Sequence, residues 1–262
     1  MPSTGSTKPT GRFTGQLWAG LVGLVLLLII WQQAAAKLSP LVLPSPAQTA
    51  HRLALLFQAG AITKQLVISF RRALTGFVIA YTSAFILAIL MNRFRWVRYF
   101  FQPWLAAVQI VPVVIWLILA VLWFGIAQEK TPIFVVAIVC LPVVLVQIKE
   151  GLDAIPVELL DLAALEPLGL YNYALHIAWP SLRPALIGAA TLGFSFAWRS
   201  VVFAEFVASN AGLGYQLSRA YHNLATDEVF AWTIVLVVVL WLWQMLVIGP
   251  WRRHSRHNGT VT

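Results

Sequence analysis

The sequence has little charge and only one cysteine. Lys, Arg, Asp and Glu together make up 10% of its 262 residues, whereas a soluble domain usually carries about 25%. Hydrophobic residues make up 60%, and the mean hydropathy is +0.81. This composition excludes a soluble globular enzyme, a disordered chain and a collagen-like chain. It is typical of a membrane protein with several spans.

Motifs for redox, metal and nucleotide chemistry are also missing from the sequence. Cys140 has no partner for an internal disulfide and lies in an apolar run, so we expect it to be a core residue. The five histidines show no catalytic arrangement, and no spacing of Cys, His, Asp or Glu predicts a metal site. A Gly-x-x-x-x-Gly-Lys-Ser/Thr phosphate-binding loop is absent. We therefore expect no catalytic residues here, and any ATP hydrolysis that drives this protein should come from another polypeptide.

The charges that are present are mostly basic. There are 18 Lys and Arg against 9 Asp and Glu, which gives a net charge of +9. In a membrane protein this excess indicates cytoplasmic loops and contact with anionic lipid. No basic run is long enough to follow the phosphates of a nucleic acid.

Six apolar segments are long enough to cross a membrane, since a helical span needs roughly 20 apolar residues. The sequence therefore predicts an all-α membrane protein with about six transmembrane helices. These predicted spans cover approximately residues 17–31, 73–91, 101–124, 132–148, 184–206 and 229–251.

The sequence predicts that the chain divides into three parts. Residues 1–15 are polar and predict a disordered cytoplasmic lead. We expect residues 16–36 to be retained as the first membrane anchor, with a cleaved secretory signal peptide as the alternative. The remaining core, 37–262, begins with Leu43-Pro44-Ser45-Pro46, an extended turn, and a short amphipathic helix over 47–58.

An even number of spans places both termini on one side of the membrane. Assigning that side to the cytoplasm gives it more basic residues than the outer side, as the positive-inside rule requires. Arg71 and Arg72 do not fit easily, because they precede the second span on the outer side.

Small residues recur every four positions in the second span, at Gly76, Ala80, Ala84 and Ala88. This spacing places them on one stripe of a helix, where a neighbouring helix can approach closely.

Polar residues within the spans are the candidates for a translocation pathway. A charge at the bilayer centre costs roughly 2.5–3.5 kcal/mol, so Arg199 is expected to face a bundle interior or a watery cavity, or else to snorkel to the interface. Glu205 lies six residues later, about 9 Å along the helix and about 120° around it, so each charge needs a partner elsewhere. The remaining pathway candidates are Gln109, Trp116 and Trp198, although interhelical hydrogen bonding is the alternative for Gln109 and for Gln147.

A polar stretch at about 153–181 separates the fourth and fifth spans. Two short amphipathic helices with a break near Pro167–Gly169 fit its pattern, and Pro180 would stop the second helix. An ordinary interfacial loop is the alternative that periodicity allows. The stretch resembles the cytoplasmic coupling loop of ATP-binding-cassette (ABC) importer permeases, the binding-protein-dependent transport family. That loop begins with Glu-Ala-Ala, has Gly six positions after the Glu, and ends in Ile-x-Leu-Pro. The positions that the match identifies are Asp161, Ala163, Pro167 (in place of the Gly), Gly169, Ile177 and Pro180.

Further motifs resemble the nitrate, sulfonate and taurine branch of this family, and the resemblance covers about residues 39–250. These motifs are Leu43-Pro44-Ser45-Pro46, Val111-Pro112, Trp123-Phe124-Gly125-Ile126, Trp198-Arg199, Ala204-Glu205 and Gly212-Leu213-Gly214.

The resemblance implies a non-enzymatic permease subunit with the type I importer fold, in a bacterial inner membrane. It implies a second permease copy or a paralogue, and two cytoplasmic ATPase subunits that bind ATP and Mg and dock on the coupling loop. It also implies a periplasmic or lipid-anchored solute-binding protein, which would dock near an outer loop that holds Gly212 and Gly214. The expected solute is an oxoanion such as nitrate, sulfonate or taurine, with a thiamine-pyrimidine precursor or another heterocycle as the alternative.

Two other classes of protein are alternatives. A stand-alone secondary transporter or channel often shows internal repeats, and we find no convincing repeat. An intramembrane enzyme needs a paired nucleophile and base, and no Ser, His and acid lie at matched depth.

Overall fold

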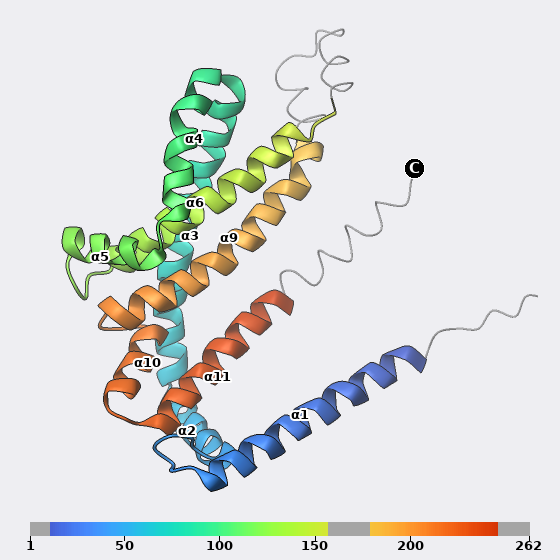
Figure 1. Ribbon diagram of the computed structural model, residues 1–262, viewed down its shortest axis with the longest axis vertical. Helices are drawn as coiled ribbons and strands as arrows, with labels where there is room; N and C mark the ends of the chain where they lie inside the picture. The colour runs from blue at the N-terminus through green and yellow to red at the C-terminus, as the bar shows by residue number, and fades with distance from the viewer. Residues whose placement is uncertain (1–10, 157–178, 246–262) are drawn as a thin grey trace, which may run out of the picture.

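The computed structural model describes residues 11–156 and 179–245, and every regular element in those ranges is a helix. The helices are α1 (Gly11–Lys37), α2 (Pro46–Gln58), α3 (Ala61–Arg93), α4 (Arg95–Ile110), α5 (Val113–Phe124), α6 (Lys130–Asp153), α9 (Trp179–Ala208), α10 (Leu213–His222) and α11 (Thr226–Trp243). Figure 1 shows α6 and α9 running side by side through the molecule, with α3 crossing behind them.

Five of these helices, α1, α3, α6, α9 and α11, are long and apolar enough to cross a membrane. The pair α4 and α5 adds a sixth crossing if the two are counted together. The pair starts beside the end of α3, and just after it the backbone N–H of Ala127 donates to the carbonyl of Ala208 at the end of α9. The pair thus connects the two ends of the bundle, and the predicted fold class is confirmed.

The predicted third span, 101–124, is not one continuous helix. It is divided between α4 and α5, which meet at an angle of 100°. Pro112 has no backbone N–H, and the residue before a proline is biased towards extended backbone. Val111 is indeed extended, with φ −68° and ψ 121°. Pro103 lies inside α4 without ending it.

The small-residue stripe of α3 allows close packing against α6. Gly76, Ala80, Ala84 and Ala88 are all buried. A Cβ added at Gly76 would lie 2.7 Å from the Ile133 carbonyl oxygen. The prediction of a close helix–helix approach at this stripe is confirmed.

Helix α3 begins at Ala61, about twelve residues before the predicted second span. Arg71 and Arg72 therefore lie within a membrane-length helix and not in a loop. The predicted span began only after these two arginines because they are hydrophilic. In the structure the helix begins about twelve residues earlier and includes both of them.

The turn before α2 works as a helix cap. The Ser45 hydroxyl accepts from the Gln48 backbone N–H, and the Gln48 side chain accepts from the Ser45 N–H. Pro46 occupies the first turn, where a missing N–H costs nothing. The predicted short helix over 47–58 is confirmed as α2.

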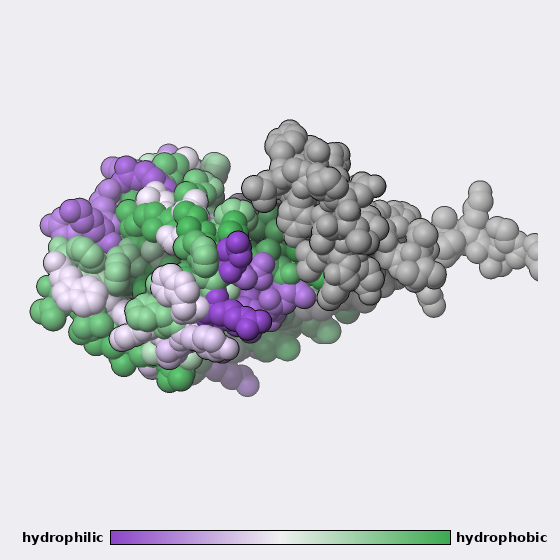
Figure 2. Space-filling model, turned by 90° about the horizontal axis from the view of Figure 1, so that it is seen from above, coloured by the Kyte–Doolittle hydropathy of each residue, from purple (hydrophilic) through white to green (hydrophobic). Residues whose placement is uncertain are grey.

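Helix α1 lies at the edge of the bundle (Figure 1). Its apolar side chains from Leu21 to Ile30 are exposed. It is attached near its C-terminal end, where the Trp31 indole stacks on Phe230 and donates to the Pro44 carbonyl at 3.0 Å. Hydrophobic side chains also cover much of the described surface in Figure 2, as expected for a protein in contact with lipid.

Candidate functional site

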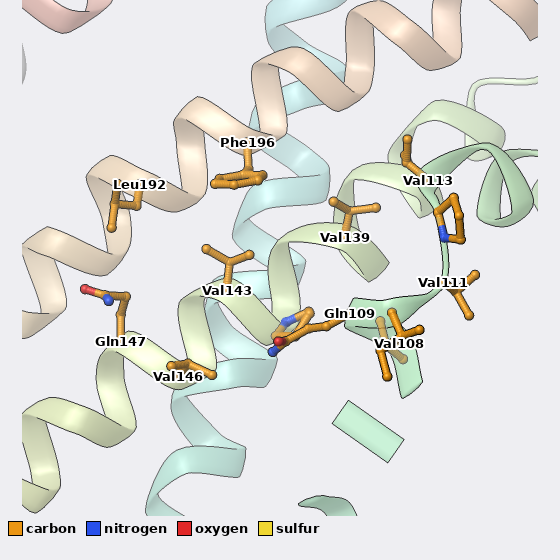
Figure 3. Close-up of a pocket in the computed structure, with 13 residues that line it drawn as sticks. Val108, Gln109, Val111, Val113, Val139, Val143, Val146, Gln147, Leu192 and Phe196 are labelled. Carbon is orange, nitrogen blue, oxygen red and sulfur yellow. The ribbon is translucent and has the colours of Figure 1, made fainter. Parts of the chain in front are cut away.

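A cavity of about 500 Å³ lies where α4 breaks from α5, against α6 and α9 (Figure 3). Most of the residues that line it carry apolar side chains: valines, prolines, an isoleucine, a leucine and Phe196. Gln109 and Gln147 are the two polar side chains among the described residues that line it. An apolar concave wall with a few polar groups is typical of small-molecule sites.

The helix break positions Gln109 at this cavity. Because α4 ends at Ile110, Gln109 lies in its last turn, where its side chain is exposed and extends towards the middle of the cavity (Figure 3). Pro112 has no N–H to offer the Val108 carbonyl, the helical partner four residues earlier. The indole of the half-buried Trp116 donates to that carbonyl instead, at 3.4 Å. Of the predicted pathway residues, Gln109 therefore lines the cavity. Trp116 does not line the cavity, but its hydrogen bond stabilises the backbone at the break between α4 and α5.

Gln147 lines the cavity from α6, although sequence reasoning did not select it as a pathway residue. Its amide nitrogen donates to a Glu150 carboxylate oxygen at 3.4 Å. Val139, Val143 and Val146 precede it on the same wall at spacings of three and four. That helical period was the signal in the sequence that could have identified Gln147.

Arg199 shares the helix face that lines the cavity, but it is not among the lining residues. It follows Leu192 by seven residues, which is about 20° short of two full turns and about 10 Å along α9. The Arg199 side chain is exposed, and no hydrogen bond or ion pair joins it to another described residue. The structure thus places Arg199 beyond Phe196, towards the C-terminal end of α9.

Glu205 lies elsewhere, in a buried polar cluster between α9 and α3. One of its carboxylate oxygens accepts from Arg72 Nη1 at 2.9 Å. The other accepts from the Ser69 hydroxyl at 2.6 Å and from the Gly214 N–H at 3.2 Å. Sequence analysis expected a partner for Glu205 on another helix, but it did not identify Arg72.

The same cluster holds the loop between α9 and α10, which the sequence predicts to lie on the outer side. Arg72 also donates to the Ser209 hydroxyl at 2.9 Å and to the Ala211 carbonyl at 2.7 Å. On the other side of the loop, the Gly212 N–H donates to the Gln65 amide oxygen at 2.8 Å. These contacts fix the backbone of 209–214 directly against α3.

Both glycines of the Gly-Leu-Gly motif are required by this packing. Gly212 has φ +104°, and a Cβ there would lie 2.2 Å from the Glu205 carboxyl carbon. A Cβ on Gly214 would lie 2.1 Å from the Val202 carbonyl oxygen. The motif thus lets the loop approach Glu205 closely.

Trp198 is a core residue in this chain, only 2% exposed, and it does not line the cavity. It packs in a buried cluster with Cys140 and Trp232. Cys140 is fully buried, as expected.

The predicted coupling-loop residues Asp161, Ala163, Pro167, Gly169 and Ile177 lie outside the described residues. Pro180 is exposed in the first turn of α9. The helices on either side of this segment meet tightly, since a Cβ on Gly151 would lie 2.2 Å from the Ala185 Cβ. The described chain on either side of this segment, α6 and α9, is therefore closely packed.

Comparison with known proteins identifies the family of this chain. The model of the binding-protein-dependent transport system inner membrane component matches residues 76–249. The riboflavin transport system permease protein RibX of Chloroflexus aurantiacus is 31% identical over 83% of this chain and 82% of its own length. The taurine transport system permease protein TauC of Escherichia coli is 26% identical over 90% and 88%. A solved inward-facing structure of the MetNI methionine ABC transporter covers 73% of this chain and 93% of its own, with a TM-score of 0.60 and 16% identity. The chain therefore belongs to the family of binding-protein-dependent ABC importer permeases.

Proposed function

We propose that this chain is the membrane-spanning subunit of an importer that moves a small solute with ATP hydrolysed by a partner subunit. The observation that supports this proposal best is the cavity between α6, α9 and the break of α4 from α5. A discontinuous helix at membrane depth that lines a cavity is a typical solute site in transporters. The protein itself supplies the path, and the chemistry of ATP stays in the partner.

The proposed assembly holds two permease subunits, either two copies or one copy and a paralogue. Two ATPase subunits that bind ATP and Mg would dock on the segment 157–178, which the tight packing of Gly151 against Ala185 anchors to α6 and α9. A periplasmic or lipid-anchored binding protein would deliver the solute near the 209–214 loop. The assembly would lie in the bacterial inner membrane with both termini of this chain in the cytoplasm.

Two classes of solute follow from the relatives. Taurine and aliphatic sulfonate permeases support the oxoanion predicted from the sequence. The riboflavin permease supports a heterocycle. An oxoanion would draw on the cationic Arg199, whereas a heterocycle would draw on the amides and apolar wall of the cavity.

A loop replacement tests the coupling role. Replacing residues 161–169 with a Gly-Ser linker should leave the permease inserted in the membrane but abolish its co-purification with the ATPase. The matched control replaces residues 2–10, a segment of equal length in the predicted lead, and should keep the complex intact. A complex that survives the 161–169 replacement would show that another surface binds the ATPase.

A further inference from the structure

The charge of the cavity wall indicates which solutes the cavity can hold. None of the described residues that line it carries an ionisable side chain. Glu150 lies one turn beyond Gln147 at one end, and Arg199 lies one turn beyond Phe196 at the other. These two charges have opposite signs. The residues next to the cavity therefore do not favour an anion over a cation, or a cation over an anion. An ion in this cavity would lose hydration without gaining a partner, which is strongly unfavourable.

The hydrogen-bonding groups of the cavity are two carboxamides on different walls. Gln109 projects from the end of α4 and Gln147 from α6 (Figure 3). Within the described part of the chain, the Gln109 side chain has no hydrogen-bond partner, and the Gln147 amide oxygen accepts no bond. Each carboxamide offers a donor and an acceptor side by side. The complementary group is one that also holds a donor beside an acceptor, such as a lactam, an imide or a primary amide.

The shape of the wall favours a flat molecule. The Phe196 ring points from α9 into the cavity (Figure 3), and Pro112 and Pro142 add two rigid rings to the lining. An aromatic ring such as Phe196 packs favourably with another flat ring, in an offset-stacked or edge-to-face arrangement. A volume of about 500 Å³ lies within the range of small-molecule pockets, roughly 300–1,000 Å³.

We infer that the cavity selects an uncharged, planar solute with a neighbouring donor and acceptor on its edge, which Gln109 and Gln147 bind as specificity-determining residues. This inference rests on the proposed function, because it takes the cavity as part of the transport path. Among the solutes expected from the sequence, it favours a heterocycle over an oxoanion.

The test measures binding to the purified complex of permease and ATPase. Thymine and nicotinamide serve as uncharged planar probes, and methanesulfonate and nitrate serve as oxoanion probes at constant ionic strength. Dissociation constants come from the rise of Tm with probe concentration, since a ligand that binds the folded state stabilises it. Gln109→Leu and Gln147→Leu should each weaken binding of the uncharged probes about tenfold, the effect of losing roughly one hydrogen bond. Gln58→Leu, at an exposed glutamine of α2 outside the cavity, is the matched control and should bind like the unmodified complex.

The outcomes separate the inference from the function on which it rests. Binding of an uncharged probe that both cavity variants weaken and the control variant keeps would support the inference. Stabilisation by the oxoanions alone, by none of the probes, or equally in all three variants would overturn it. Co-purification with the ATPase, measured in the same samples, reports on the proposed function independently of which probe binds.

Discussion

Arg72 and Glu205 lie 2.9 Å apart across the interface of α3 and α9, and both side chains are almost completely removed from solvent and lipid, at 2% and 0% exposure. The two positions are 133 residues apart in the sequence. Each charge is compensated inside the protein. Further hydrogen bonds, from Arg72 Nη1 to Ser209 and Ala211 and from the Gly214 N–H to the Glu205 carboxylate, hold the loop 209–214. The pair therefore joins two membrane-length helices and this loop into one unit.

Removing one member of this pair should destabilise the protein strongly. Arg72→Gln and Glu205→Gln each leave a buried charge without its partner, a change that costs about 3–5 kcal/mol. We expect a clear fall in the Tm of the purified complex for both variants.

Arg71 provides a matched control for this experiment, because it is the adjacent residue and its ion pair with Glu129 is exposed. Arg71→Gln should cost about 1 kcal/mol or less. If Arg72→Gln is tolerated as well as Arg71→Gln, then the buried pair does not hold the bundle together.

Gly214→Ala should also lower the Tm and the yield of folded protein. The new methyl group would meet the Val202 carbonyl and the Glu205 side chain, and overpacking of this kind costs about 1–3 kcal/mol. Gly23→Ala is the comparison, since a Cβ there meets nothing within 4 Å and should be tolerated. Equal Tm values for the two variants would contradict the close approach of the loop to α9.

Arg199→Gln should leave the Tm unchanged, and it should reduce transport of an oxoanion more than transport of an uncharged heterocycle. The exposed side chain lies about one turn beyond Phe196, so its loss removes a positive charge beside the proposed path but breaks no ion pair among the described residues. Uptake into proteoliposomes and the Tm of the same preparation are the two measurements. A lower Tm would assign Arg199 a structural role, and normal uptake would remove it from the path.

The topology can be tested by cysteine labelling in a Cys140→Ala background. Ser3→Cys and Asn258→Cys should react with an impermeant reagent only after the membrane is permeabilised, because the proposed topology has six crossings and both termini in the cytoplasm. Asn223→Cys, at an exposed position between α10 and α11, should react without permeabilisation. Labelling of either terminus from outside would overturn the proposed topology of six crossings with both termini in the cytoplasm, or would show that the first segment is cleaved.

Local patterns in the sequence predicted the helices and their close packing. The period of four at Gly76 to Ala88 and the amphipathic pattern over 47–58 both depend on residues within one helix. Such signals can be read from a single sequence, because the physical interactions are between near neighbours. They did not place Gln109 at a break, because the predicted third span, 101–124, ran through Pro112 as one segment.

Contacts between distant segments could not be predicted in the same way. The Arg72–Glu205 pair depends on α3 starting at Ala61, whereas hydropathy places both Arg71 and Arg72 outside the span. The 100° bend was not expected either, because residues 101–124 are apolar on both sides of Pro112. In the sequence Gln147 is an isolated polar residue within an apolar span. Only the structure shows that α4 and α9 form the other walls of the cavity that Gln147 lines.

The break between α4 and α5 has an electrical consequence. Backbone groups that leave a helix at membrane depth are tolerated only where protein covers them or where they face water. At the break, the Val111 N–H still donates to the Ala107 carbonyl and the Pro112 carbonyl accepts from the Ile115 N–H, while both residues line the cavity. Where such a cavity opens to water, the membrane potential falls over a layer of protein thinner than the roughly 30 Å hydrocarbon core. The closed transporter has to hold back protons and ions within that thin layer, so leak current is a direct measure of how well its gate seals.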